Sequence, residues 1–218
     1  MTLRNDMLAA VALLIALVGG VSAWMDRPGH VDVPAGRSDT GVYLVQPLRA
    51  GEQGALRGNA GETLQPVAHF ETRGRNLHME RFTPGKGLSN RVPGLRSSTH
   101  DIGLGYGPMT DGANVELLTY SHDGALGGRW LNWRPRGEAG QQRWPRLAPY
   151  LTNVHVIPAT KEIEGRITRL KIGELVTLRG LLVNVRYPSG QVANTWGTAG
   201  DRDCEIVWVT EVVAQRLY

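Results

Sequence analysis

The sequence predicts a mainly β fold with minor helix and, over residues 151–218, a small β-barrel of OB type or a similar one. The 218 residues include 28 glycines and 12 prolines, which favour turns and strands over a helical bundle. A strand, a short helix and one long strand follow one another within residues 151–187. The apolar alternation of the long strand changes phase at Gly180. Small closed sheets turn their corners at such glycine bends.

Residues 7–24 are an uncharged apolar run, at the short end of what a membrane-spanning helix needs. Two interpretations of residues 1–24 remain open. In the first, these residues are a transmembrane anchor. In the second, they are a signal peptide, in which Val21-Ser22-Ala23 is the signal-peptidase motif and cleavage follows Ala23. Both interpretations place the rest of the chain outside the cytoplasm, and the flanking charges weakly favour that orientation.

Residues 25–62 are predicted to be a tether or irregular segment with one short strand at 42–45. A β-rich ectodomain is expected over residues 63–218, opening with strand signals at 63–82. A basic stretch rich in Gly, Pro and Ser follows at residues 83–99 and predicts an exposed loop.

The glycine-dense segment IGLGYGPM, residues 102–109, is predicted to be a tight loop. Its GxGxG spacing has no strand and helix around it and no following GK[ST], which excludes a dinucleotide or phosphate fingerprint. Residues 114–120 are expected to form a short helix or strand. A polar connection is expected at 134–149.

Residues 129–133 read as a strand with Trp130 and Asn132 on one face and Arg129, Leu131 and Trp133 on the other.

A second strand is predicted at 153–157, where Pro158 ends it. Thr160 is the expected N-cap of a helix, and Gly173 fits the left-handed position after it. The apolar face of this helix has members at i, i+4 and i+7: Ile163, Ile167 and Leu170. A turn at 188–190, a partner strand at 191–196 and a further strand at 204–213 complete the prediction.

Six segments resemble a known family when they are taken in order: PVAHFETRGRNLHMERF, HDIGLGYGPMTD, GRWLNW, NVHVIPA, IGELVTLRGLLVNV and CEIVWV. The family consists of uncharacterised bacterial proteins with a single N-terminal hydrophobic segment, and the resemblance covers residues 65–213. It implies a location and a domain extent and says little of chemistry. Its relatives carry a Ser/Thr-rich, Arg-containing loop before the last strand, whereas this chain has TWGTAGDRDCE there. We therefore expect a single-pass protein of the bacterial inner membrane with a periplasmic C-terminal domain.

The single cysteine, Cys204, excludes an internal disulfide and a cysteine-cluster metal site. A nucleophilic thiol needs a nearby histidine or a helix N-terminus. Because Cys204 instead opens the apolar strand CEIVWV, a small buried core residue is the favoured interpretation. No cofactor and no metal site are expected.

Two His-Asp pairs, one at residues 100–101 and one at residues 122–123, suit a hydrolytic or metal site if their loops converge. No HExxH or HxH spacing supports such a site. His155 lies between Val154 and Val156 in a predicted strand, and no carboxylate or nucleophile adjoins it in sequence. A hydrogen-bonded, structural histidine is therefore favoured there over a catalytic one. The weak catalytic candidates are His100, Asp101, His122 and His155.

Arginine and tryptophan alternate in one stretch, a composition that suits anionic polymers or single-stranded nucleic acid. The alternative is that the tryptophans are core and the arginines are solvated. The binding candidates are Arg129, Trp130, Trp133, Arg134, Arg136 and Trp144.

Export argues against nucleic acid as the partner. An envelope or membrane protein, an anionic polymer or a lipid headgroup fits better, with residues 7–24 in the membrane. The leading hypothesis is a membrane-anchored, non-enzymatic binding or scaffolding module. A hydrolase with a His/Asp loop site, with or without a metal, and a nucleic-acid-binding OB-type module are the alternatives.

Overall fold

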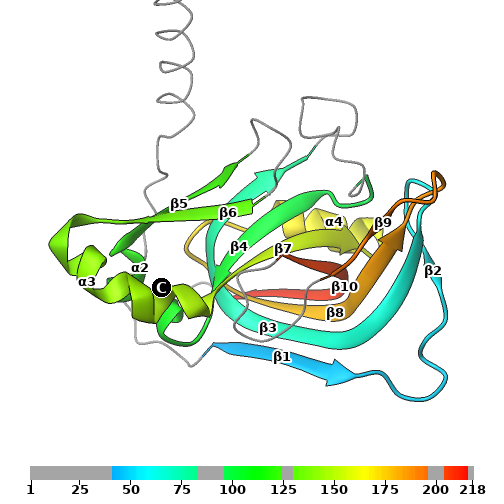
Figure 1. Cartoon of the computed structure of the whole chain (residues 1–218), viewed down its shortest axis with the longest axis horizontal. Coiled ribbons are helices and arrows are strands. Elements are labelled where there is room, and N and C mark those ends of the chain that lie inside the picture. Colours follow the sequence, from blue (N-terminus) through cyan, green and yellow to red (C-terminus); the bar gives the residue numbers. More distant parts are fainter. Residues whose placement is uncertain (1–40, 83–95, 124–129, 196–203, 216–218) are drawn as a thin grey trace, which may run out of the picture.

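The computed structural model describes residues 41–82, 96–123, 130–195 and 204–215, and there the protein is mainly β, as predicted (Figure 1). The predicted anchor or signal segment, residues 1–24, lies outside the described residues. Within the part that is described, no helix is long and apolar enough to cross a membrane.

Eight strands form one large sheet. In chain order they are β1 (Val42–Pro47), β2 (Leu56–Arg57), β3 (Thr63–Arg81), β4 (His100–Gly105), β7 (Leu151–Pro158), β8 (Leu175–Arg186), β9 (Val192–Ala193) and β10 (Cys204–Gln215). Five of them pair in a closed circuit, β3, β4, β7, β10, β8 and back to β3. β7 and β10 are parallel, and the other pairs of the circuit are antiparallel. The residues after 150 thus contribute three of the five strands, and β3 and β4 complete the circuit.

β3 closes the circuit because it is long enough to pair with two strands in succession. Its first part, residues 63–75, pairs with β8, and residues 75–81 pair with β4. The strand signals at 63–82 therefore belong to one 19-residue strand. The irregularity predicted at Gly180 falls in the partner strand β10, whose register shifts between Val209 and Glu211. A Cβ on Gly180 would lie 2.1 Å from the carbonyl oxygen of Trp208, so only glycine permits this approach.

The interior of the closed circuit is filled by alternate side chains of its five strands. α4 (Lys161–Thr168) adds Ile163, Ile167 and the following Leu170 to this core, as its predicted apolar face requires. Thr160 caps the helix, since its hydroxyl accepts the backbone N–H of Ile163 at 3.2 Å. Gly173 does adopt a left-handed φ of 90°, in the turn that follows the helix.

Residues 106–150 are an insertion between β4 and β7. It contains η2 (Gly107–Thr110), α2 (Gly112–Val115), the hairpin of β5 (Leu118–Asp123) and β6 (Trp130–Pro135), α3 (Gly137–Leu147) and η3 (Ala148–Tyr150). The ends of the insertion meet, because the backbone N–H of Tyr106 donates to the carbonyl of Tyr150 at 3.0 Å. Figure 1 shows the hairpin beside β4 and β7 with α3 at one end.

The hairpin packs on the outer face of the sheet through its apolar side. Leu118, Tyr120 and Leu131 are buried there, in a cluster that includes Leu151 of β7. Gly103 of β4 makes the contact possible, since a Cβ at that position would lie 2.5 Å from the Leu131 side chain.

Three local predictions were wrong. Residues 102–109 are not one tight loop: the first half belongs to β4, a strand buried on both faces, and only the second half is a turn of 3₁₀ helix. Residues 134–149 contain α3, an 11-residue helix that holds Pro145 and few apolar residues. The partner strand predicted at 191–196 is confined to Val192–Ala193 in the described residues.

Candidate functional site

Three neighbouring strands bring Asp101, His155 and Cys204 together on the outer face of the sheet. Asp101 of β4 lies directly opposite His155 of β7 in the antiparallel register. Cys204 of β10 pairs with Asn153, which is two residues before His155 and on the same face. Directly opposed and diagonal neighbours on one face of a sheet lie within side-chain reach. Segments more than 100 residues apart in the chain therefore converge here.

The strand pattern of β7 explains why polar side chains gather at this place. Val154 and Val156 point into the interior core, so their neighbours face outward. Along that outward face Leu151 belongs to the apolar cluster beneath the hairpin, and Ile157 belongs to a second apolar cluster. Asn153 and His155 lie between the two clusters. The site is thus a polar strip enclosed by apolar packing.

The contacts follow the order carboxylate, imidazole, thiol. Nδ1 of His155 lies 2.7 Å from Oδ1 of Asp101, and Cys204 is near enough to the His155 ring to help raise its pKa. Asp101 is fully buried and His155 is 5% exposed. Since Nδ1 is engaged by the carboxylate, Nε2 is the ring nitrogen left for the thiol. This is the arrangement by which a histidine activates a nucleophile while a third group orients the ring.

The environment of His155 favours its charged form. Burial lowers its pKa, but the charge and hydrogen bond of Asp101, together with Cys204, outweigh burial and raise the pKa to about 9. His155 is therefore an imidazolium at neutral pH, held between a carboxylate and a sulfur atom. A histidine beside a cysteine is the group that serves a thiol nucleophile as its acid and base.

A second polar contact reaches the sulfur from Asn153. Its Nδ2 lies 3.3 Å from Sγ of Cys204, and its Oδ1 lies 2.9 Å from Nε2 of His122 on β5. Nδ1 of His122 in turn lies 2.7 Å from Nδ1 of His78 on β3. Burial, and secondarily His122, lower the pKa of His78 to about 4, so His78 is neutral at physiological pH.

Glu205 follows Cys204 and points to the other face, into the interior. It is 1% exposed and accepts hydrogen bonds from the hydroxyls of Tyr43 and Thr152. Burial raises its pKa to about 7, although both hydroxyls favour the ionised form. The carboxyl group therefore links β1, β7 and β10 beneath the outer site.

The histidine and acid candidates are partly united by the structure. Asp101 and His155 are in contact, and His122 joins them through Asn153 and Cys204. His100 precedes Asp101 on β4 and points the opposite way, where its Nδ1 lies 2.9 Å from the Thr99 hydroxyl.

Sequence reasoning missed Cys204, which is half-buried beside His155 rather than enclosed in the core. The available signal was alternation: Asp101 adjoins the inward-facing Ile102, and His155 lies between the inward-facing Val154 and Val156. The strand pairing that unites them is a long-range property.

The arginine and tryptophan candidates divide between the two sides of the hairpin. Trp130 is 64% exposed, Arg134 is exposed on the same side of β6, and Arg136 is exposed directly after the strand. Trp133 and Trp144 are partly buried against the apolar cluster under the hairpin. The faces predicted for β6 are thus confirmed. Arg129 lies outside the described residues.

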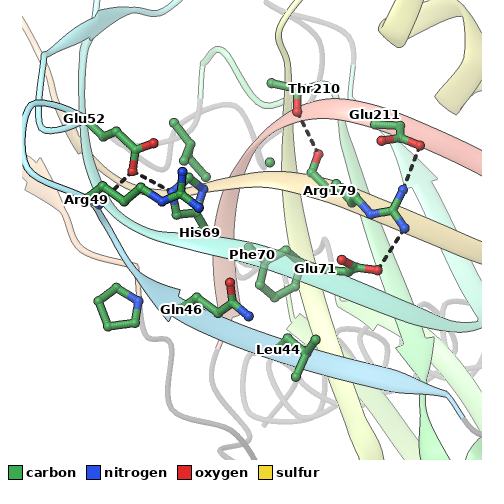
Figure 2. Close-up of a pocket in the computed structure, with 13 residues that line it drawn as sticks. Leu44, Gln46, Arg49, Glu52, His69, Phe70, Glu71, Arg179, Thr210 and Glu211 are labelled. Atoms are coloured by element: carbon green, nitrogen blue, oxygen red, sulfur yellow. Dashed lines mark hydrogen bonds and ion pairs between the residues drawn. The ribbon is translucent and has the colours of Figure 1, made fainter.

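A separate hollow lies on the sheet surface where β1, β3, β8 and β10 adjoin (Figure 2). Its charged groups are matched with one another. Arg179 contacts Glu71 at 3.0 Å and Glu211 at 2.8 Å, and His69 contacts Glu52 at 2.8 Å. A hollow whose charges already satisfy one another indicates no particular ligand.

Within the described residues, no group of three or more His, Cys, Asp or Glu side chains is arranged to hold a metal ion. Comparison of the chain with protein-family models, curated proteins and solved structures gave no match. The resemblance to a family of exported bacterial proteins therefore stays a prediction, and the function is argued from the site itself.

Proposed function

We propose that this protein is a thiol-dependent acyl hydrolase whose nucleophile is Cys204. The single observation that carries the proposal is that Asp101, His155 and Cys204 gather on one face of three neighbouring strands, with the His155 ring 2.7 Å from the carboxylate of Asp101 and Cys204 helping to raise its pKa. This order replaces the metal-dependent or loop-based hydrolase considered from the sequence. The substrate class is a carbonyl compound with a leaving group: an ester, thioester or amide.

Each chemical step uses a group of this site. The Cys204 thiolate attacks the carbonyl carbon, a C–S bond forms, and the carbonyl π electrons move to oxygen. As the tetrahedral intermediate collapses, the bond to the leaving group breaks and His155 gives its Nε2 proton to that group. Water then attacks the thioester while His155 accepts a proton from it. The C–S bond breaks, the acid is released and the thiolate–imidazolium pair is restored. Asp101 keeps the ring oriented and stabilises its positive charge throughout.

The architecture around the site supports a related proposal, that the closed circuit is an OB-type barrel. Its support is a five-strand circuit, β3, β4, β7, β8 and β10 in chain order, with α4 inserted between the third and fourth strands. Ligands of OB folds bind on the face of the second and third strands. Those strands here are β4 and β7, which carry Asp101 and His155.

The test is reaction of the purified domain with p-nitrophenyl acetate, followed by intact mass and by release of nitrophenol. We expect an acetyl group on Cys204 in the wild type, and loss of acetylation in Cys204→Ser. His155→Gln and Asp101→Asn should slow acetylation by at least about tenfold. His69→Gln is the matched control, because His69 is an exposed histidine that contacts Glu52 away from the site. Equal acetylation rates in the wild type, H155Q and D101N would refute the proposal.

The exposed side of β6 favours a second candidate function, the docking of an anionic envelope polymer. Its support is one exposed indole, Trp130, on the same face of β6 as the exposed Arg134, with the exposed Arg136 directly after the strand. Such a strip binds by stacking and by charge, so affinity falls as salt rises. The test measures the affinity of a polyanionic glycan for the wild type and for Trp130→Ala, which should bind more weakly. Ile172→Ala removes an exposed apolar side chain elsewhere and is the control. Equal affinities would remove the candidate.

We further propose that the ectodomain is held at the periplasmic face of the bacterial inner membrane. This rests on the uncharged run at residues 7–24. A topology reporter fused after Tyr218 should be active only outside the cytoplasm. Activity of a cytoplasmic reporter at the same position would contradict the placement.

A further inference from the structure

We propose that Asn153 is a further catalytic residue of this site and that His122 is its positioning residue. The inference rests on the proposed function and concerns how the negative charge on Cys204 is stabilised. Four side chains on four strands form a continuous arm that ends on the reacting sulfur. They are His78 of β3, His122 of β5, Asn153 of β7 and Cys204 of β10.

The directions of the hydrogen bonds follow from the chemistry of the groups. A thiolate has no proton, so Nδ2–H of Asn153 must donate to Sγ across the 3.3 Å contact. The amide oxygen then accepts from Nε2–H of His122 at 2.9 Å. When the ring proton of His122 is on Nε2, its Nδ1 holds a lone pair and accepts Nδ1–H of His78 at 2.7 Å. Every donor in the arm points toward the sulfur.

A rotated amide would break this order. It would place the Asn153 oxygen against the thiolate and its NH₂ group against the N–H of His122. The amide oxygen would then face the sulfur, an acceptor against an acceptor, and the NH₂ group would face the N–H of His122, a donor against a donor. The contact with His122 therefore fixes which end of the amide meets Cys204. The position of the β5–β6 hairpin thereby determines the hydrogen bonding of the nucleophile.

The arm complements the imidazolium rather than duplicating it. His155 supplies a charge and the transferable proton, whereas Asn153 supplies a neutral donor that remains in place when His155 gives its proton away. Hydrogen bonds to the charged form of a group favour that form. The burial that lowers the pKa of His78 keeps the far end of the arm neutral, which preserves its donor and acceptor pattern.

The experiment measures the alkylation rate of Cys204 by iodoacetamide across pH in the full domain. We expect Asn153→Ala to react about tenfold more slowly than wild type at pH 7 and to reach half its maximal rate at higher pH. Asn153→Asp should be slower still, because a carboxylate beside the sulfur repels the thiolate. His122→Ala should lower the rate, and His122→Gln should restore it, since a glutamine amide also donates to the Asn153 oxygen.

Ser121→Ala is the matched control, as Ser121 lies beside His122 on β5 and on the opposite face of the hairpin. Near-ultraviolet circular dichroism identifies any variant that fails to fold, and the comparison of H122Q with H122A then decides. Equal rates for wild type, N153A and N153D, or equal rates for H122A and H122Q, would overturn the inference. Loss of reactivity in H155Q and D101N without any effect of N153A would refute this inference alone. No effect of H155Q or D101N would refute the proposed function itself.

Discussion

The buried pair of His155 and Asp101 makes folding stability depend on pH in a defined window. The pKa of His155 is raised in the folded protein to about 9, from 6.5 for an ordinary imidazole. The folded state therefore holds a proton that the unfolded state releases between these two values. The stabilisation is fully present below pH 6.5 and is lost as pH rises through 9. Stability should fall with rising pH across this window.

The size of the decrease follows from the two pKa values. Each pKa unit corresponds to about 1.4 kcal/mol, so the contribution of His155 to the free energy of unfolding is on the order of 3 kcal/mol. No reduction for solvent screening is needed, because the imidazole and the carboxyl group are enclosed. A loss of that size is about a fifth to three fifths of the roughly 5 to 15 kcal/mol by which a typical domain is stable.

The assay is urea unfolding at several pH values from 6.5 to 9.5, followed by tryptophan fluorescence, on the wild type and on the double variant Asp101→Asn/His155→Gln. The double variant keeps a neutral hydrogen-bonded pair in place of the ionic one and should lose the His155-linked decrease. Other titrating groups are common to both proteins and cancel in the difference. A pH dependence that is the same in both proteins, or a wild type that gains stability toward pH 9, would refute the reasoning.

Three further outcomes follow from other described contacts. Glu205→Gln should raise the free energy of unfolding at pH 9 by about 3 kcal/mol in urea titrations. The pKa of this buried carboxyl is raised to about 7, so its charged form destabilises the folded protein above that pH. An unchanged unfolding midpoint would contradict this. Gly180→Ala should lower the free energy of unfolding by about 3 kcal/mol or more, because the added Cβ would collide with the backbone of β10. Gly54→Ala should leave the stability nearly unchanged, because no atom lies within 4 Å of the Cβ position. Thermal unfolding measures both. Arg179→Ala should lower the free energy of unfolding by less than about 1 kcal/mol, since its two ion pairs are exposed, and a loss that does not shrink in high salt would show that packing dominates.

Local patterns in the sequence predicted the elements that local physics determines. The capped helix after Thr160 has one apolar face and one N-cap, both of which lie within a few residues. The two faces of β6 follow from alternation alone. By contrast, the strand at residues 100–105 was not recognised, because it is buried on both faces and Gly103 is required by a side chain of the hairpin. Its identity as a strand depends on partners far away in the chain.

The candidate site shows the same limit. Asp101, His155 and Cys204 were each visible in the sequence, and two of them were named as candidates. Their convergence depends on a register across three strands, including the parallel pairing of β7 with β10. Register of this kind is set by the whole closed circuit and leaves no mark on the few residues around each side chain. Cys204 was for this reason assigned to the core.

The meeting of Tyr106 and Tyr150 has a consequence for engineering. The backbone hydrogen bond between them, and the 2.7 Å bond from the Tyr106 hydroxyl to the carbonyl of Pro149, hold the two ends of the insertion together. A short turn can span these ends, although excision of residues 107–149 would leave the buried guanidinium of Arg75 without the Thr110 carbonyl to which it donates. Excision would strip His122 from the amide of Asn153 while leaving Asp101, His155 and Cys204 on their own strands. Comparing the shortened chain with the full chain would show what the inserted segment contributes to the reactivity of Cys204.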